Sequence, residues 1–234
     1  MRIPSWLFDE LAHAGAEHLD AAYVAGYERK TGFDPSQDAA RLRQLGLEPS
    51  GTLVDLGAGT GAVALAVAPF CRRVVAVDVS APMLAALAEH ARQHEVTNLE
   101  CVRAGFLTYA HLGDPADVVY SRHALHHLPD FWKAISLERI AAMLRPGGVF
   151  YLRDLLYSFE PPDADRAFER WFSHAAPRPE AGWTRAELET HVREEHSTFT
   201  WLLEPMLERA GLAIQEREFS GSQTYAAYIC VKAG

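Results

Sequence analysis

The sequence predicts an α/β fold: a doubly wound, mostly parallel sheet of seven strands that ends in an antiparallel hairpin. Between residues 52 and 153, short apolar runs alternate with longer segments of helical periodicity. Such alternation is typical of a parallel sheet with helices on both faces. Near the C-terminus, two β-like segments at 213–219 and 224–232 are separated by only a few residues. A connection this short makes neighbouring strands antiparallel.

Local patterns place the individual elements. The five parallel strands are expected at 52–56, 74–78, 98–103, 117–121 and 147–153. Helices are expected at 60–70, 81–94, 131–144, 163–175, from 184 onward and at about 198–210. Ser80 is a helix N-cap, and Thr184 with Glu187 has the spacing of a capping box. Together these signals predict that helices separate the strands all along the parallel part of the sheet.

The first 47 residues are expected to be helical. Ile3, Leu7 and Leu11 repeat at helical spacing, and the pattern breaks at 31–35, after which Ser36 can cap a second helix. We therefore expect an N-terminal helical lid at 1–47. The main domain would then occupy 48–234, with a helical insert at about 157–200.

Composition limits the function classes. The chain has 234 residues and a net charge of −9, from 22 basic and 31 acidic residues, which disfavours nucleic acid as a partner because phosphate binding needs a basic surface. Its three cysteines are too few and too scattered for disulfides or a zinc site. Neither a signal peptide nor a membrane-spanning apolar run is found. We expect a cytoplasmic protein, monomeric or homodimeric, that acts on a small molecule.

The most informative segment is Val-Asp-Leu-Gly-Ala-Gly-Thr-Gly at 54–61, between an expected strand and an expected helix. Glycines in this turn let a ligand approach the backbone, and Asp55 adds a carboxylate that suits a cationic group. Asp78 ends the next strand, about 20 residues further on, where an acid can bind ribose hydroxyls. Gly57, Gly59 and Ala62 also fit the dinucleotide pattern G-x-G-x-x-A. The turn and Asp78 thus predict a nucleoside-bearing cofactor without choosing between NAD and S-adenosylmethionine.

Four segments together resemble the class I S-adenosylmethionine-dependent methyltransferases of the small-molecule type, over roughly residues 50–232. They are the glycine turn at 54–61, Val77-Asp78-Val79-Ser80 with Met83, the run 117–128 with its three histidines, and Leu144-Arg145-Pro146-Gly147-Gly148. The resemblance implies a Rossmann-like sheet with the terminal hairpin. That hairpin argues against a plain dinucleotide-binding fold.

The resemblance also implies a cofactor site. Its expected residues are Asp55 at the methionine amine, Gly57, Ala58 and Gly59 along the methionine and ribose, Asp78 at the ribose hydroxyls, Val79 and Met83 around the adenine, and Ser121 after the fourth strand. The sequence departs from the family after the third strand, where a Gly-Asp pair often holds the adenine amino group. No acid stands beside Gly105 here. Backbone groups of Gly105 and Phe106, with the Phe106 ring stacking, are expected to replace it.

The acceptor should lie beyond the carboxyl ends of the strands. His123 is our candidate general base because histidine titrates near neutrality, and Asp154 is the second catalytic candidate. The residues expected to contact the acceptor are Tyr23, Tyr27, Arg122, His126, Tyr157 and His196. Arg122 would bind an acidic acceptor or pair with Asp130.

Glu194 and Glu195 beside His196 suggest metal ligands, but neighbouring residues of a helix diverge. A solvated face is the interpretation we favour, with no metal site.

These observations predict an enzyme that moves a methyl group from S-adenosylmethionine to O, N or C of a small molecule, releasing S-adenosylhomocysteine. Two alternatives stay open from the sequence. One is an NAD-dependent oxidoreductase, and the other is a non-catalytic protein that binds S-adenosylmethionine.

Overall fold

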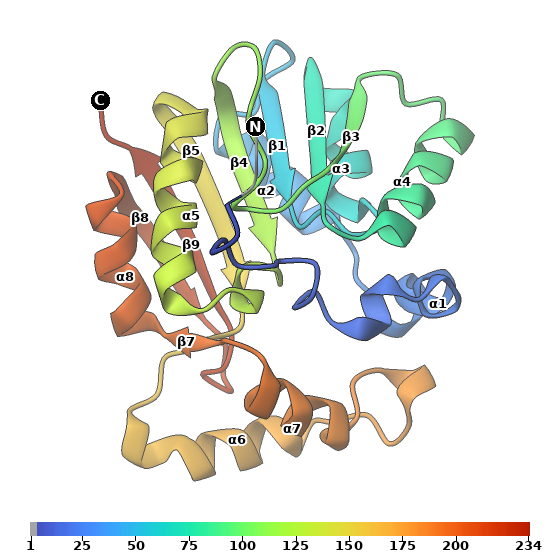
Figure 1. Cartoon of the computed structure of the whole chain (residues 1–234). Coiled ribbons are helices and arrows are strands. Elements are labelled where there is room, and N and C mark those ends of the chain that lie inside the picture. The colour runs from blue at the N-terminus through green and yellow to red at the C-terminus, as the bar shows by residue number, and fades with distance from the viewer. Residues whose placement is uncertain (1–3) are drawn as a thin grey trace.

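The computed structural model describes residues 4–234. In this part of the chain, seven strands form one sheet in the order β3-β2-β1-β4-β5-β9-β8 (Figure 1). The strands are β1 (Thr52–Leu56), β2 (Arg73–Asp78), β3 (Leu99–Arg103), β4 (Ala116–Arg122), β5 (Leu144–Asp154), β8 (Leu212–Phe219) and β9 (Ala226–Lys232). The first five are parallel, and β9 runs antiparallel to both β5 and β8. The sheet and its hairpin, as predicted from the sequence, are confirmed.

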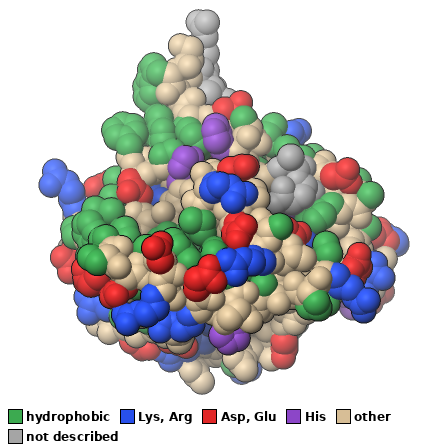
Figure 2. Space-filling model, turned by 90° about the horizontal axis from the view of Figure 1, so that it is seen from below, with side chains coloured by type: hydrophobic (Ala, Val, Ile, Leu, Met, Phe, Trp, Pro, Cys, Tyr) green, Lys and Arg blue, Asp and Glu red, His purple; other side chains and the backbone are tan. Residues whose placement is uncertain are grey.

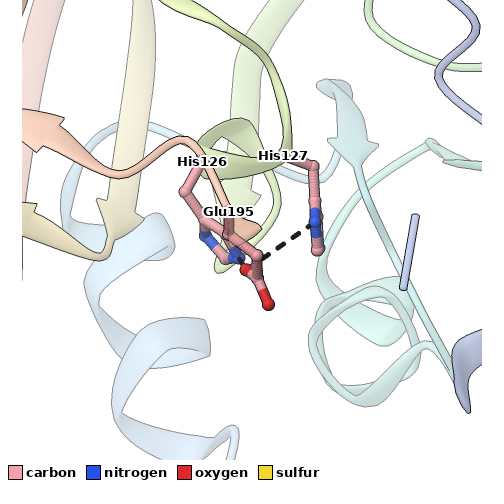
Figure 3. A group of neighbouring side chains, drawn as sticks. All are labelled: His126, His127 and Glu195. Carbon is pink, nitrogen blue, oxygen red and sulfur yellow. Dashed lines mark ion pairs between the residues drawn. The ribbon is translucent and has the colours of Figure 1, made fainter. Parts of the chain in front are cut away.

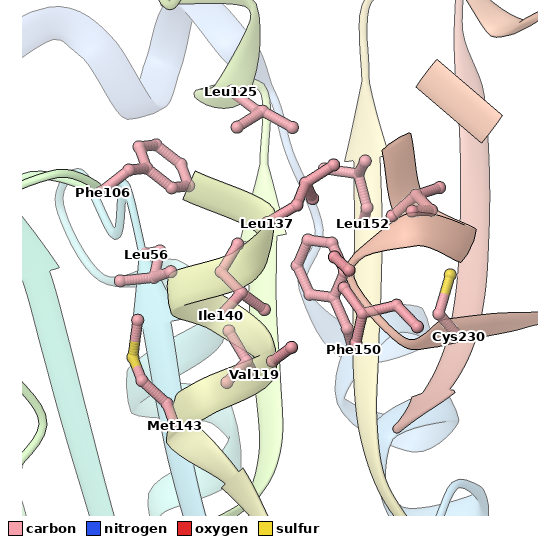
Figure 4. Packing of buried hydrophobic residues seen from close by; sticks show 14 of the residues in the cluster. Leu56, Phe106, Val119, Leu125, Leu137, Ile140, Met143, Phe150, Leu152 and Cys230 are labelled. Atoms are coloured by element: carbon pink, nitrogen blue, oxygen red, sulfur yellow. The ribbon is translucent and has the colours of Figure 1, made fainter. Parts of the chain in front are cut away.

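Helices cover both faces of the sheet because strand side chains alternate between two apolar clusters. On one face, α5 (Asp130–Met143) and α8 (Thr200–Arg209) pack against the sheet. In Figure 4, Leu137 and Ile140 of α5 lie against Val119 and Phe150 of the strands. The other face is covered by α2 (Ser36–Gln44), α3 (Ala62–Val67) and α4 (Ala81–Gln93). The central strands are therefore buried on both sides.

A smaller layer lies beyond the carboxyl ends of the parallel strands, below the sheet in Figure 1. It contains α6 (Ala164–Phe172) and α7 (Arg185–Glu194). Along the chain, these helices lie between two short strands that pair with each other, β6 (Leu156–Tyr157) and β7 (Thr198–Phe199). The predicted capping box of α7 is confirmed, because Thr184 and Glu187 each accept from the other's backbone N–H. α1 (Ala21–Thr31) lies beside this layer.

The prediction of a helix through residues 4–19 is wrong, while Ile3 lies outside the described residues. This segment forms turns and one short 3-10 helix, Ala16–Leu19. Leu7 and Phe8 pack against the main apolar cluster. The segment follows the surface of the domain in an irregular path, because these contacts outweigh its weak helical periodicity. A regular helix starts only at α1, where the Asp20 carboxylate accepts from two backbone N–H groups.

None of the helices in the described part of the chain has the length and apolarity that a membrane crossing needs.

We predict that Gly61→Ala lowers the free energy of unfolding by about 3 kcal/mol, because it adds both a clash and backbone strain. A Cβ at this position would lie 1.9 Å from Cδ1 of the buried Leu87, and the residue has a φ of +83°. Urea unfolding would measure the loss.

Gly32→Ala is the matched control. It has a φ of +54° with nothing within 4 Å of the added Cβ, so it should cost about 1 kcal/mol from backbone strain alone. Equal losses in the two variants would contradict the packing argument.

Candidate cofactor and acceptor site

The strand order places the predicted site. β1 lies between β2 and β4 in the sheet, so the chain leaves β1 in one direction and later returns on its other side. Ligands of open α/β sheets bind at such a reversal, beyond the carboxyl ends of the strands. The glycine turn follows β1, and the loop with His123, His126 and His127 follows β4. Two adjoining cavities open between these loops and the N-terminal segment.

The three glycines of the turn have different physical roles, although all have positive φ. A Cβ on Gly57 would lie 2.2 Å from the Cβ of Ala124, so this glycine allows the loop after β4 to pack closely. Gly61 likewise allows α4 to pack closely, because a Cβ here would clash with Leu87 of that helix. A Cβ on Gly59 would meet nothing within 4 Å, and Gly59 borders the first cavity. Gly59 is therefore the position where the backbone is open to a ligand.

Asp78 joins the end of β2 to the glycine turn. Its Oδ2 accepts from the backbone N–H of Gly59 at 2.8 Å, and its Oδ1 accepts from that of Ser80 at 2.8 Å. Burial raises the pKa of this carboxyl, while the backbone N–H groups act in the opposite direction. Asp78 also lines the first cavity, next to the apolar side chains of Val79, Met83 and Phe106. The cavity thus has a polar middle and an apolar end.

Glu10 is the residue of this site that the sequence did not reveal. A Cβ built on Gly105 would lie 2.4 Å from Cδ of Glu10, so the Glu10 carboxyl fills the space that a side chain at position 105 would enter. Its Oε2 accepts from the backbone N–H of Leu107 at 3.1 Å. Burial raises the pKa of Glu10 from 4.5 to about 7. The acid that is missing after β3 is therefore present in space, contributed by the N-terminal segment.

Asp55 is buried at the end of β1 and faces a cavity that Gly57, Ala58 and Gly59 also line. Burial, together with the neighbouring carboxylates Asp78 and Asp38, raises the pKa of Asp55 from 3.8 to about 7. A cationic group beside this carboxyl would relieve both effects.

Arg122 pairs with Asp38 at 3.1 Å, so the expected pairing with Asp130 is wrong. Asp38 on α2 is buried and also binds Arg153 at 2.9 Å and the Tyr120 hydroxyl at 2.6 Å. The Arg122 guanidinium lies over the Phe33 ring. Arg122 still borders the first cavity, but its charge is already balanced by Asp38.

His123 lines both cavities but is a poor general base. Its pKa is lowered from 6.5 to about 3, mainly by burial and then by the positive charge of Arg122. A φ of +49° places it in the left-handed region, where a residue with a side chain is strained. Its backbone N–H donates to the carbonyl of Arg153 at 2.8 Å, which holds it there. The ring is held next to the ligand sites in a neutral form.

The second cavity has a volume of about 430 Å³ and is covered by α1 and α7. Tyr23 and Tyr27 of α1 line it, as do His127 and Tyr225. Lys30 of α1 pairs with Glu187 of α7 at 2.5 Å, and its ammonium lies 4.5 Å from the centre of the Trp183 ring. This contact connects the two sides of the cover. Across the face seen from below in Figure 2, acidic and basic side chains are interspersed.

Four of the predicted site residues line none of these three cavities. Tyr157 packs among Phe159, Phe168 and Phe199 in a separate aromatic cluster. The His196 ring lies near those of Phe8 and His13. Ser121 is fully buried in the sheet. The packing of the insert places Tyr157 and His196 outside these cavities, and Ser121 is buried because it lies within β4.

Asp154 is the fourth, and it lies behind His126. Its Oδ1 is 2.5 Å from Nδ1 of His126, and its Oδ2 accepts from the His126 backbone N–H at 3.1 Å. Burial acts to raise the pKa of Asp154, but the charge and hydrogen bond of His126, with smaller effects of His123 and the Leu155 N–H, together lower it. Burial acts to lower the pKa of His126, but Asp154 and Glu195 together raise it to about 9. Asp154 therefore positions His126 and does not contact a ligand in the cavity.

Glu195 points inward, so its assignment to a solvated face is wrong. It follows α7 with extended backbone, which turns its side chain towards His126 and His127 (Figure 3). Its Oε2 lies 2.8 Å from Nε2 of His126 and 3.8 Å from Nδ1 of His127. The site thus contains a cluster of two imidazoles and one carboxylate at the wall of the second cavity.

The chain is similar in sequence to known methyltransferases. Residues 53–148 match a family model described as a methyltransferase domain. The matched residues are thus similar in sequence to a methyltransferase domain, over less than half of this chain. The chain is 30% identical over 113 residues to the uncharacterized methyltransferase YcgJ of Bacillus subtilis, covering 48% of this chain and 44% of that protein. It is 33% identical over 141 residues to phosphoethanolamine N-methyltransferase 2 of Caenorhabditis elegans, covering 59% of this chain and 31% of that protein. Both matches span less than half the length of the relative.

The strand order, with its terminal antiparallel hairpin, is that of the class I methyltransferase fold. The magnesium protoporphyrin IX methyltransferase of Synechocystis, solved with bound SAH, aligns with a TM-score of 0.67 over 96% of this chain and 100% of that one. The two sequences are 13% identical, so the likeness concerns the fold alone.

We predict that docking of Glu10 against Gly105 and Leu107 makes the stability of the protein depend on pH. The folded-state pKa of about 7 lies above the ordinary 4.5, so the folded chain binds this proton more tightly than the unfolded chain. The contribution of Glu10 is complete below pH 4.5 and is lost as the pH rises to about 7. Urea unfolding of wild type and Glu10→Gln across this range would measure it, with wild type losing stability relative to the variant. A difference that does not change with pH would contradict the prediction.

Proposed function

We propose that the protein is an S-adenosylmethionine-dependent methyltransferase that acts on a small-molecule acceptor. The observation that carries the proposal is the open backbone at Gly59 beside the Asp78 carboxylate, within the residues that match a methyltransferase domain. A fold by itself does not define a reaction, so the proposal depends on how well these residues fit the cofactor.

The residues around the first cavity, and around the cavity that Asp55 faces and that shares Gly57 and Gly59 with it, fit S-adenosylmethionine at each part of the molecule. Asp78 would bind the ribose hydroxyls, since its carboxylate lines the cavity beside Gly59. Asp55 would face the methionine ammonium, which offers the cationic group that its raised pKa calls for. The apolar end formed by Val79, Met83 and Phe106 would hold the adenine ring. Glu10 lies at this same end.

When bound, the cofactor supplies a methyl group on a positively charged sulfur. The chain then has to align the acceptor and exclude water. The cover formed by α1 and α7 does this over the second cavity, which is connected to the first through residues that line both, His18, Tyr27, His123 and His127. A volume of about 430 Å³ suits a small molecule. The relative named for phosphoethanolamine gives further support to a small acceptor.

Calorimetric titration with S-adenosylhomocysteine tests the proposal. We expect one binding site, and Asp78→Asn should weaken binding at least about 100-fold, because it removes a charge-assisted hydrogen bond and disturbs the glycine turn. Asp114→Asn is the control, since Asp114 is exposed and is not among the residues that line the first cavity. Absence of binding by the wild-type chain would overturn the assignment. Tight binding of NADH instead would favour the oxidoreductase.

Glu10 should contribute to recognition of the adenine amino group. We expect wild type to bind S-adenosylhomocysteine at least about tenfold more tightly than the inosine analogue, which carries oxygen in place of that amino group. Glu10→Ala should weaken binding of the adenine ligand and remove most of this preference, whereas Glu10→Gln, which keeps an acceptor oxygen, should retain part of it. If Glu10→Ala weakened both ligands equally, Glu10 would only hold the N-terminal segment in place.

A further inference from the structure

The cluster of His126, His127 and Glu195 brings together ligand atoms from two separate elements. The histidines come from the short turn Leu125–His127 after β4, and Glu195 follows α7. One ligand atom of each residue lies within 4.8 Å of the others (Figure 3). Two atoms bound to one metal ion at about 2.1 Å would be separated by roughly 3.0–3.4 Å. The distances of 2.8 and 3.8 Å from Glu195 Oε2 to the two rings bracket that range.

A buried ring nitrogen of this cluster lacks a hydrogen-bond partner. Oε2 of Glu195 is in ion-pair contact with Nε2 of His126 and Nδ1 of His191, at 2.8 Å from each. Within the described part of the chain, Nδ1 of His127 is buried without a hydrogen bond, 3.8 Å from the same oxygen. Buried polar atoms nearly always have a partner, and exceptions point to a bound ion or water. An ion between the two rings and the carboxylate would satisfy all three groups.

The surroundings hold these side chains in the orientation that metal binding requires. Asp154 lies 2.5 Å from Nδ1 of His126 and so leaves Nε2 directed at Glu195. Metal-bound histidines typically donate their other N–H to a carboxylate in this manner. On the opposite side, Nδ1 of His191 lies 2.8 Å from Glu195 Oε2, and its Nε2 is hydrogen-bonded to Ser197 at 2.8 Å. His191 therefore positions the Glu195 carboxylate.

We propose that His126, His127 and Glu195 bind a divalent transition-metal ion of the zinc type, which in turn binds an oxygen atom of the acceptor. Two imidazoles and one carboxylate form a donor set found at catalytic zinc sites, which keep a further position open. Magnesium and calcium prefer oxygen ligands and fit this set poorly. All three residues line the second cavity, so the open position would face the acceptor.

The role of the ion in transfer rests on the proposed function. A hydroxyl bound to the metal loses its proton to solvent at lower pH than a free one. The resulting oxygen forms a bond to the methyl carbon as the carbon–sulfur bond breaks, and the sulfur keeps that electron pair. This arrangement activates an acceptor hydroxyl without a strong base, which agrees with the low pKa of His123.

Metal binding is tested on the full chain after chelator treatment, by calorimetric titration with Zn²⁺ and by the visible spectrum of the Co²⁺ form. We expect one Zn²⁺ per chain, and ligand-field bands typical of mixed nitrogen and oxygen coordination for Co²⁺. Glu195→Gln and His127→Ala should each weaken Zn²⁺ binding at least about 100-fold, because loss of a supporting contact alone costs 10–100-fold. His174→Ala, at an exposed histidine outside the cluster, should bind like wild type.

Binding of S-adenosylhomocysteine by the same samples separates this proposal from the proposed function. Glu195 lines the second cavity but not the first, so Glu195→Gln should bind that ligand as wild type does, which also shows that it folds. Failure of wild type to bind one Zn²⁺, or equal Zn²⁺ affinity in wild type and Glu195→Gln, would overturn the metal site and leave the methyltransferase assignment intact. If the wild-type chain bound Zn²⁺ but not S-adenosylhomocysteine, the methyltransferase assignment would be overturned and the metal site would stand.

Discussion

The structure depends on how it neutralises four carboxyl groups that are buried at one edge of the sheet. An ionised carboxylate away from water is costly unless it is paired or hydrogen-bonded. Each group meets this constraint differently. Asp38 binds two arginines, Asp78 accepts backbone N–H groups, Asp154 pairs with an imidazole, and Asp55 has other carboxylates as neighbours and a raised pKa. The first three connect the loops after β1, β4 and β5 into one frame, and a cationic ligand beside the fourth would stabilise its charged form.

This frame separates the rigid part of the site from its cover. The glycine turn and the loop after β4 are held by the sheet, by Asp78 and by the contact of Gly57 with Ala124. The cover consists of α1, α7 and the segment before α1, and its two helices bury few residues: Val24 in α1, and Leu188 and His191 in α7. Elements with few buried contacts open most easily. Ligand entry through the cover would therefore leave the binding residues of the frame in place.

The electrostatics of the second cavity distinguish its histidines from one another. His123 lies beside Arg122 and stays neutral, while His126 lies between Asp154 and Glu195 and is stabilised in the charged form. The pKa values of His123 and His126, which are close in sequence, are thus shifted in opposite directions by their neighbours in space. A metal ion at the cluster would compete with the proton on His126 for the same nitrogen.

The sequence by itself determined the sheet, its hairpin and the helices from α1 onward. It also determined the glycine turn at Gly59 and the carboxylate of Asp78 at the end of the next strand. Periodicity, capping residues and glycine turns act over a few residues and can be read locally. The tertiary structure alone decided that residues 4–19 follow the surface, that Glu10 fills the space beside Gly105, and that Glu195 turns inward to the histidines. Glu10 and Gly105 lie far apart in the chain, and such a pairing depends on the burial of both segments against the folded domain. No local signal carries that information, because the free energy that favours it exists only once the sheet has formed.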